Sequence, residues 1–298
     1  MKSIDALTQF LQTHPDVETF EVILHDLNGI HRGKWLPREQ INKLFEGGYK
    51  MPQSTCSLDC WGRDLEQLVA ATGDTDGICT PHPETLAVVP WASRPTAQII
   101  VSMLSPDGQS DYPADPRVVL QQVLARYTKL GLTPVVASEM EFHLLEIDRD
   151  QFGRPQHTQR ALDGSPALGG ATYGIEAMRK IAPLMDAISS TAGQQNLPVD
   201  TLISEFGASQ CEINLHYQDC ALRACDQASM LRRAIRAVAH QQGKQASFMA
   251  KPFADDVGNG MHIHFSLLDS SGVNVFDNGT AEGSELLQYA VAGCLENM

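Results

Sequence analysis

Residues 138–144 read Ser-Glu-Met-Glu-Phe-His-Leu, and the alternation in this stretch decides how the chain is interpreted. Successive side chains of a β-strand point to opposite faces of the sheet. One face of this strand therefore carries Glu139, Glu141 and His143, while the other carries Met, Phe and Leu. Such a strand is expected to bury its apolar face and to present its carboxylates together on the other.

The same alternation recurs in two later segments, 211–216 and 261–267. The polar side chains are Glu212, Asn214 and His216 in the first segment, and His262, His264 and Ser266 in the second. Ordinary amphipathic strands with a solvated outer face are the alternative interpretation. Solvated faces usually carry Lys, Arg and Thr, whereas these faces contain neither Lys nor Arg. The composition therefore favours a site that binds metal or handles protons.

If the three faces converge, a fourth carboxylate joins them, because Glu205 lies close to Glu212 in the sequence. Packed carboxylates repel one another and become partly protonated unless cations are present. Oxygen-rich ligation with one or two imidazoles suits Mg²⁺ or Mn²⁺ better than zinc or copper. Two such ions are a common device for neutralising charge in phosphoryl transfer.

The whole chain has 298 residues, a formal net charge of −14 and 43% apolar residues, which indicates a globular protein with ample core. The acidic balance argues against a nucleic-acid surface. We expect no membrane span, and the odd number of Cys residues, without a C-x-x-C pair, predicts reduced thiols and a cytoplasmic location.

Strands and helices do not alternate strictly, so an α+β fold with an antiparallel or mixed sheet is expected. A turn at residues 105–108 predicts a boundary between domains 1–107 and 108–298. The second domain is expected to contain strands at 133–147, 200–206, 211–217, 246–251 and 261–268, helices at 117–130, 174–195 and 220–242, and a polar flap at 153–174. Gly258-Asn259-Gly260 precedes the last strand, where the backbone can approach a ligand closely. The sequence contains no P-loop and no G-x-G-x-x-G motif.

Taken together, these segments resemble the glutamine synthetase family. The matching elements are Ser138-Glu139-Met140-Glu141-Phe142, Glu205 with Gln210-Cys211-Glu212, Lys251-Pro252-Phe253, Gly258 to His264, and Asp115-Pro116-Arg117. Their order and spacing make the resemblance specific, and it covers nearly the whole chain. Within the family, the sequence is most similar to the branch that joins glutamate to polyamines.

The resemblance implies a role for each site residue. Glu141, Glu205 and Glu212 would hold one Mg²⁺ or Mn²⁺ ion, and Glu139 and His262 a second. Asn259 and Gly260 would bind glutamate, while Tyr217, His264 and Ser266 would lie on the ATP side. The implied reaction transfers the γ-phosphoryl group of ATP to the γ-carboxylate of glutamate, and an amine then attacks the acyl phosphate.

The family also implies a small β-grasp-like N-terminal domain, an antiparallel-sheet catalytic domain and a homo-oligomeric ring with active sites between subunits. By this resemblance the catalytic domain is truncated, since the family's catalytic arginines and a glutamate are expected beyond Met298. Pro52 stands where the family has an aspartate that helps to deprotonate ammonium, and Asp59 is out of register. This departure favours an organic amine over ammonia.

Three alternatives remain at this point. The protein could use ammonia, as a glutamine synthetase does. It could be a non-catalytic relative with a structural or regulatory role, although the intact set of acidic and histidine residues argues against this. It could also be an unrelated two-domain metal hydrolase, which the Gly-Asn-Gly-Met-His-Ile-His segment disfavours.

Overall fold

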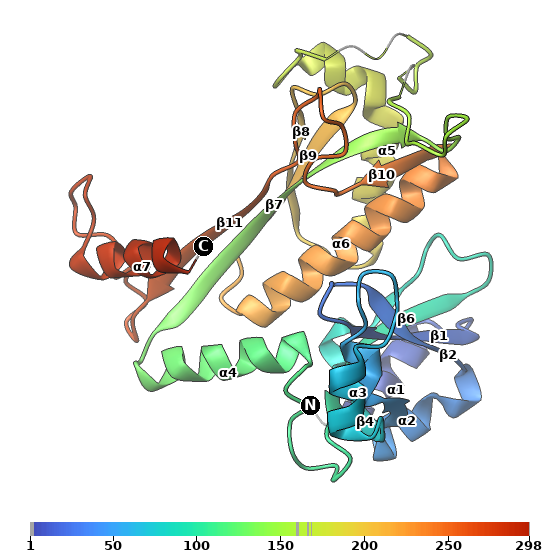
Figure 1. Ribbon diagram of the computed structural model, residues 1–298, viewed down its shortest axis with the longest axis vertical. Helices are drawn as coiled ribbons and strands as arrows, with labels where there is room; N and C mark the ends of the chain where they lie inside the picture. Colours follow the sequence, from blue (N-terminus) through green and yellow to red (C-terminus); the bar gives the residue numbers. More distant parts are fainter. Residues whose placement is uncertain (1–2, 159–160, 166, 168, 298) are drawn as a thin grey trace. The chain divides into compact units, whose positions relative to one another are not determined.

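The computed structural model describes residues 3–158, 161–165, 167 and 169–297, and the chain forms two compact units (Figure 1). The first unit contains the chain up to Val123 together with Gln194–Asn196, and the second contains the remainder. The boundary expected near residue 107 therefore lies within the first unit. Among the described residues, the helices are all too short or too polar to cross a membrane.

The first unit is built on a mixed sheet with strand order β2-β1-β6-β4-β3, in which β5 also pairs with β6. Its strands are β1 (Thr19–His25), β2 (His31–Pro37), β3 (Tyr49–Pro52), β4 (Asp76–Pro81), β5 (Ala87–Val88) and β6 (Thr96–Leu104). Its helices are α1 (Ser3–Thr13), α2 (Ile41–Gly47) and α3 (Glu66–Thr72), with 3-10 helices η1 (Arg38–Gln40), η2 (Gln53–Cys56) and η3 (Pro83–Thr85). β1 pairs with β6 in parallel, whereas the other described pairings of this sheet are antiparallel.

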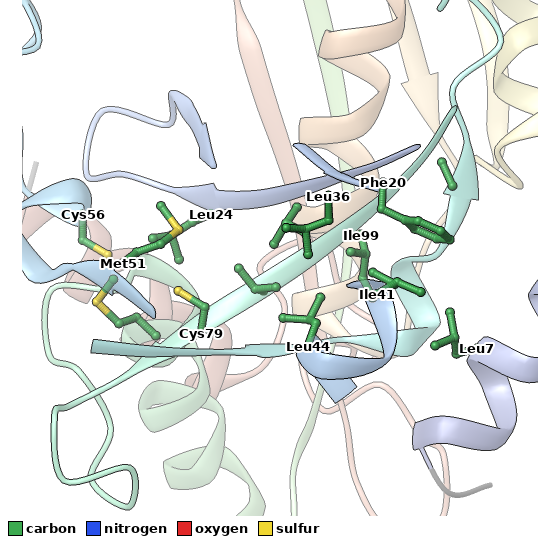
Figure 2. Packing of buried hydrophobic residues seen from close by; sticks show 14 of the residues in the cluster. Leu7, Phe20, Leu24, Leu36, Ile41, Leu44, Met51, Cys56, Cys79 and Ile99 are labelled. Carbon is green, nitrogen blue, oxygen red and sulfur yellow. The ribbon is translucent and has the colours of Figure 1, made fainter. Parts of the chain in front are cut away.

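One apolar cluster forms the core of this unit (Figure 2). Side chains from β1 and β6 meet side chains from α1 and α2 there; Phe20, Ile99, Leu7 and Leu44 are each at most 1% exposed. Burial of such a side chain stabilises the fold by about 1.5–3 kcal/mol relative to leaving it in water. The helices therefore cover the sheet because their apolar faces match it.

The second unit contains a sheet with strand order β10-β7-β9-β8, to which β11 adds by pairing with β7. The strands are β7 (Thr133–Glu146), β8 (Val199–Ser204), β9 (Gln210–Leu215), β10 (Lys244–Ser247) and β11 (Met261–Leu268). The remaining helices of the chain are α4 (Pro116–Lys129), α5 (Ile175–Gln194), α6 (Ala221–Gln241) and α7 (Glu285–Glu296). All described pairings of this sheet are antiparallel, which confirms the expected sheet type.

The apolar face of β7 is buried, as its alternation predicts: Met140, Phe142 and Leu144 are at most 4% exposed. Helix α6 packs against β7 and β10. The opposite face of β7 carries the acidic side chains, and the candidate site lies on this face. The long β7 therefore serves as the platform on which β9 and β11 place their own polar faces (Figure 1).

One strand prediction is wrong in its extent. A strand was expected at 246–251, but β10 ends at Ser247 and the residues after it form a loop. Asn259 donates to the carbonyl oxygens of Ser247 and Met249, and its backbone N–H donates to Ala250. These carbonyl oxygens thus accept hydrogen bonds from Asn259 in the loop rather than from a neighbouring strand. The flap expected at 153–174 includes residues 159–160, 166 and 168, which lie outside the described residues.

Candidate cation site on the β7–β9–β11 face

The strand register brings the three polar faces together, as the alternation predicts. Glu139 on β7 lies opposite Asn214 on β9 and, on its other side, opposite His262 on β11. Glu141 lies opposite Glu212. Directly opposed side chains in an antiparallel pair have Cβ atoms about 4.5–5.5 Å apart. Residues separated by more than a hundred positions in the chain therefore become neighbours on one face.

Glu205 reaches this face from a turn rather than from a strand. It follows the last residue of β8, and its backbone N–H donates to the carbonyl oxygen of Gln210 at 3.0 Å. This hydrogen bond extends the β8–β9 hairpin by one pair, so Glu205 is two residues from Ile203, the partner of Glu212. Glu205 and Glu212 consequently share a face, as expected if all four carboxylates belong to one site.

The tightest group on this face consists of Glu139, Glu212 and His262. One ligand atom from each lies within 4.8 Å of the others, a spacing at which three groups can share a cation. The group takes Glu212 from one of the two predicted ligand sets and Glu139 and His262 from the other. Glu141 and Glu205 lie outside it but are close enough that their charges act on one another and on Glu212.

Burial raises the pKa of the Glu212 carboxyl, and the charges of Glu139, Glu205 and Glu141 raise it further. Burial and the charge of Glu141 likewise raise the pKa of Glu205, while His262 opposes this. Glu212 is only 7% exposed. Mutually repelling, partly desolvated carboxylates are the situation that a bound cation relieves.

The donor set fits a hard divalent cation. Carboxylate oxygens with one imidazole nitrogen are ligands that Mg²⁺ and Mn²⁺ accept. Asn214 adds a further observation: its Nδ2 donates to Glu139 Oε1 at 3.4 Å, and its buried Oδ1 has no hydrogen-bond partner among the described residues. A buried acceptor without a partner costs free energy unless a ligand or its water donates to it.

The residues expected on the ATP side lie along β11 and just beyond β9. His264 Nε2 lies 2.7 Å from Glu139 Oε1, and His262 Nδ1 lies 3.1 Å from Glu139 Oε2. The ring of Tyr217 packs edge-on against His264, with centroids 6.4 Å apart. Ser266 is two residues further along the same face and lies opposite Val135. His264 therefore contacts the Glu139 carboxylate directly, with Tyr217 against its ring and Ser266 further along β11.

The loop 248–260 holds Asn259 with hydrogen bonds inside the protein. Its Nδ2 group donates to the carbonyl oxygens of Ser247, the last residue of β10, and Met249, at 3.1 and 2.8 Å, and its Oδ1 lies 2.8 Å from His143 Nδ1. The carboxamide is thereby engaged at both ends. Its role as a contact to glutamate stays a prediction.

Gly260 lies against Glu141, to which it is also bound through the backbone: Glu141 N–H donates to the Gly260 carbonyl oxygen at 3.2 Å. A Cβ atom at position 260 would lie 2.7 Å from Glu141 Oε1. Glycine is therefore required for the carboxylate to keep its present place.

Sequence reasoning assigned no role to two further residues on this face, Gln210 and His143. Gln210 is 2% exposed, and its Nε2 donates to Glu141 Oε2 at 2.8 Å. His143 is fully buried; burial lowers its pKa, while the hydrogen bond with Asn259 and the charge of Asp256 oppose this shift. The alternation of polar and apolar residues already places both side chains on the acidic face. The sequence does not indicate which groups they hydrogen-bond to.

Pro52 ends β3 in the first unit, and Asp59 lies in a turn of that unit. Asp59 Oδ1 accepts hydrogen bonds from the backbone N–H groups of Trp61 and Arg63, each at 2.8 Å. The carboxylate thus has a local structural role in its own turn.

Comparison with known proteins agrees with the resemblance. The family model described as "Glutamine synthetase, catalytic domain" matches residues 113–298. The chain is 34% identical to gamma-glutamylputrescine synthetase PuuA of Escherichia coli (strain K12) over 294 residues, which is 97% of this chain and 61% of that protein. It is 31% identical to a glutamine synthetase of Halobacterium salinarum, over 91% of this chain and 56% of that protein.

A glutamate–isopropylamine ligase of Pseudomonas sp. is 27% identical over 95% of this chain and 61% of its own length. Among solved structures, ligand-free GmaS superposes with a TM-score of 0.80 and 25% identity, covering 96% of this chain and 62% of that one. The GmaS/ADP complex superposes with a TM-score of 0.78 and 26% identity, covering 96% of this chain and 61% of that one. The chain thus spans about three fifths of the length of these ligases.

Proposed function

Because this chain belongs to the glutamine synthetase family, we propose that it carries the cation-binding part of an ATP-dependent ligase that joins the γ-carboxylate of glutamate to an amine. The observation that supports this most directly is the convergence of Glu139, Glu212 and His262 from three strands. A face of this composition suits the binding of divalent cations beside phosphate groups.

In this reaction, the γ-phosphoryl group of ATP is transferred to a γ-carboxylate oxygen of glutamate, and ADP leaves. The amine nitrogen then attacks the acyl carbon, phosphate leaves, and a proton is lost from the nitrogen. Mg²⁺ or Mn²⁺, held by Glu139, Glu141, Glu205, Glu212 and His262, would supply electrostatic stabilisation of the phosphate charge.

The chain's own residues have separate tasks in this proposal. Tyr217, His264 and Ser266 lie on the side that takes ATP, and the loop containing Asn259 and Gly260 takes glutamate. We further propose a β-grasp-like N-terminal domain with its boundary near residue 107, and a homo-oligomeric ring with active sites between subunits.

An organic amine is the favoured acceptor. The relatives that support this are named for putrescine and isopropylamine, and Pro52 replaces the aspartate expected for ammonia. Ammonia is the second candidate, because relatives of comparable identity are named glutamine synthetases.

Phosphate release measured on the full-length protein tests the proposal. The assay contains ATP, glutamate, Mg²⁺ or Mn²⁺, and one of putrescine, spermidine, a monoamine or ammonia. We expect release with an organic amine and its loss in Glu212→Gln. Turnover with ammonia alone would overturn the organic-amine assignment, and no phosphate release with any amine would overturn the ligase assignment.

A further inference from the structure

The carboxamide of Gln210 joins three segments that are distant in the sequence. Gln210 begins β9 and lies opposite His143 on β7, so its side chain shares the acidic face. Its Nε2 group donates to Glu141 Oε2 at 2.8 Å and to the Gly258 carbonyl oxygen at 2.9 Å. Its Oε1 atom accepts from the backbone N–H of Gly207 at 2.9 Å. A single amide therefore connects β7, the loop before β11 and the β8–β9 turn.

Both N–H donors of the amide are used, and its oxygen accepts one hydrogen bond. A glutamine side chain has two N–H donors, and the two short contacts to Glu141 and Gly258 use them. A third acceptor, Asn259 Oδ1, lies at 3.3 Å. The side chain is 2% exposed, so water cannot readily replace any of these partners. A buried amide whose donors and oxygen are all hydrogen-bonded has a fixed orientation.

Glu141 is consequently held on two sides. Gln210 binds its Oε2 atom, while Gly260 leaves just enough room for its Oε1 atom. The turn also depends on the absence of a side chain, because a Cβ at Gly207 would lie 2.9 Å from Gln210 Oε1 and 2.6 Å from His143 Nε2. A side chain at position 207 would thus collide with the Gln210 amide in its present position.

We propose that Gln210 is a positioning residue that orients the Glu141 carboxylate toward the cation and ties this orientation to the 258–260 loop. The inference rests on the proposed function, since it assumes that Glu141 contributes to the cation site. Groups that hydrogen-bond to metal ligands fix ligand orientation, and their loss typically weakens metal affinity by about 10–100-fold.

Gln210→Met tests this role, because it removes the amide at nearly constant volume. Mn²⁺ affinity is measured by titration, with free Mn²⁺ followed by its paramagnetic resonance signal. We expect the dissociation constant to rise about tenfold or more. Gln210→Asn has a shorter side chain whose amide no longer reaches Glu141, so it is expected to weaken Mn²⁺ binding similarly. It replaces the Met variant in the test if that variant folds poorly.

Gln242→Met is the matched control. Gln242 also donates a carboxamide hydrogen bond, to the Pro183 carbonyl oxygen at 2.9 Å, but it lies at the end of α6. We expect its Mn²⁺ affinity to equal that of the wild type.

A double-mutant cycle with Glu141→Ala separates positioning from general destabilisation. If Gln210 acts through Glu141, Gln210→Met changes Mn²⁺ affinity by less than about twofold in the Glu141→Ala background. Losses that multiply in the double variant would overturn the proposal, as would wild-type affinity in both Gln210 variants. Failure of the proposed cation site looks different: Glu139→Gln and Glu212→Gln would then leave Mn²⁺ binding unchanged.

Discussion

Glu212 illustrates how a single residue acquires its properties from its neighbours. It has the partner Glu141 across the strand pair, Glu205 beyond the turn, and Asn214 two residues along. Burial and the surrounding carboxylates raise its pKa, whereas the hydrogen bond from Asn214 lowers it. The residue type alone says only that Glu212 is an acid. Because of its neighbours, its charged form destabilises the folded protein unless a cation is bound.

The raised pKa predicts a pH dependence in the absence of divalent cations. A carboxyl whose pKa is raised binds more protons in the folded than in the unfolded state, so its contribution to the free energy of unfolding falls as pH rises above its ordinary pKa of 4.5. With a chelator at about pH 7, Glu212→Gln is therefore expected to be more stable than the wild type, with a smaller difference near pH 4.5.

Urea unfolding at the two pH values measures this difference. Added Mn²⁺ should reverse the order, since a ligand that binds only the folded protein stabilises it, and the wild type binds more tightly. An equal difference at both pH values would contradict the prediction.

Cysteine exposure gives a second check at the residue scale. Cys211 lies on the apolar face of β9 and is fully buried, and burial raises its pKa. Burial likewise raises the pKa of Cys79, to about 12. Cys60 and Cys294 are exposed. Iodoacetamide at mildly alkaline pH, followed by mass spectrometry, is expected to label Cys60 and Cys294 and to spare Cys79 and Cys211. Rapid labelling of Cys211 in the folded protein would contradict the face assignment of β9.

At the scale of elements, the loop 248–260 matters as much as the strands it joins. It places Gly260 beside Glu141, and it is itself anchored by Asn259 and Gln210. Strand alternation explains the acidic face but not this loop, because the loop's shape depends on side-chain to backbone hydrogen bonds.

Gly260→Ala tests the loop's approach to β7. The added methyl group must displace the Glu141 carboxylate, a side-chain movement that costs little stability but disturbs the site. We expect Mn²⁺ affinity to fall by about tenfold. Gly193→Ala in α5 is the matched glycine control: a Cβ there meets no atom within 4 Å. That variant should gain up to about 1 kcal/mol of stability without a change in affinity. Unchanged Mn²⁺ binding in Gly260→Ala would refute the placement of the loop.

At the scale of the whole molecule, the chain forms two compact units, and the candidate cation site lies in only one of them. The apolar cluster of Figure 2 belongs to the first unit, whereas the acidic face belongs to the second. A core substitution in the first unit is therefore expected to change stability alone.

Leu44→Ala is the test, because Leu44 is fully buried in that cluster. The substitution is expected to lower the free energy of unfolding of the first unit by about 2–5 kcal/mol. Mn²⁺ affinity, measured below the unfolding transition, should stay the same. A parallel loss of affinity would contradict the assignment of the whole cation site to the second unit.

The alternation of Glu139, Glu212 and His262 with apolar residues was enough to predict three strands and one shared face, and it predicted the buried apolar faces of β7 and β9. This succeeds because a strand's period of two is a local property of the backbone. For β11 the expected burial was wrong, because Met261 and Ile263 on its apolar side are 61% and 62% exposed. The strand predicted at 246–251 was wrong in its extent, because Asn259, 10 to 12 residues further along, donates to the carbonyl oxygens of Met249 and Ser247.

The sequence by itself determined which residues of each strand share a face, because this follows from local backbone geometry, and it identified the buried side of β7 and β9 from their hydrophobicity. Only the tertiary structure decided that Gln210 binds Glu141 and that Asn214 lies opposite Glu139. It also decided that the Asn259 carboxamide donates a hydrogen bond to the backbone of its own loop. These facts depend on strand register and on side-chain hydrogen bonds between distant segments. Many alternative registers would satisfy the same alternation, and the packing of the whole unit selects one of them.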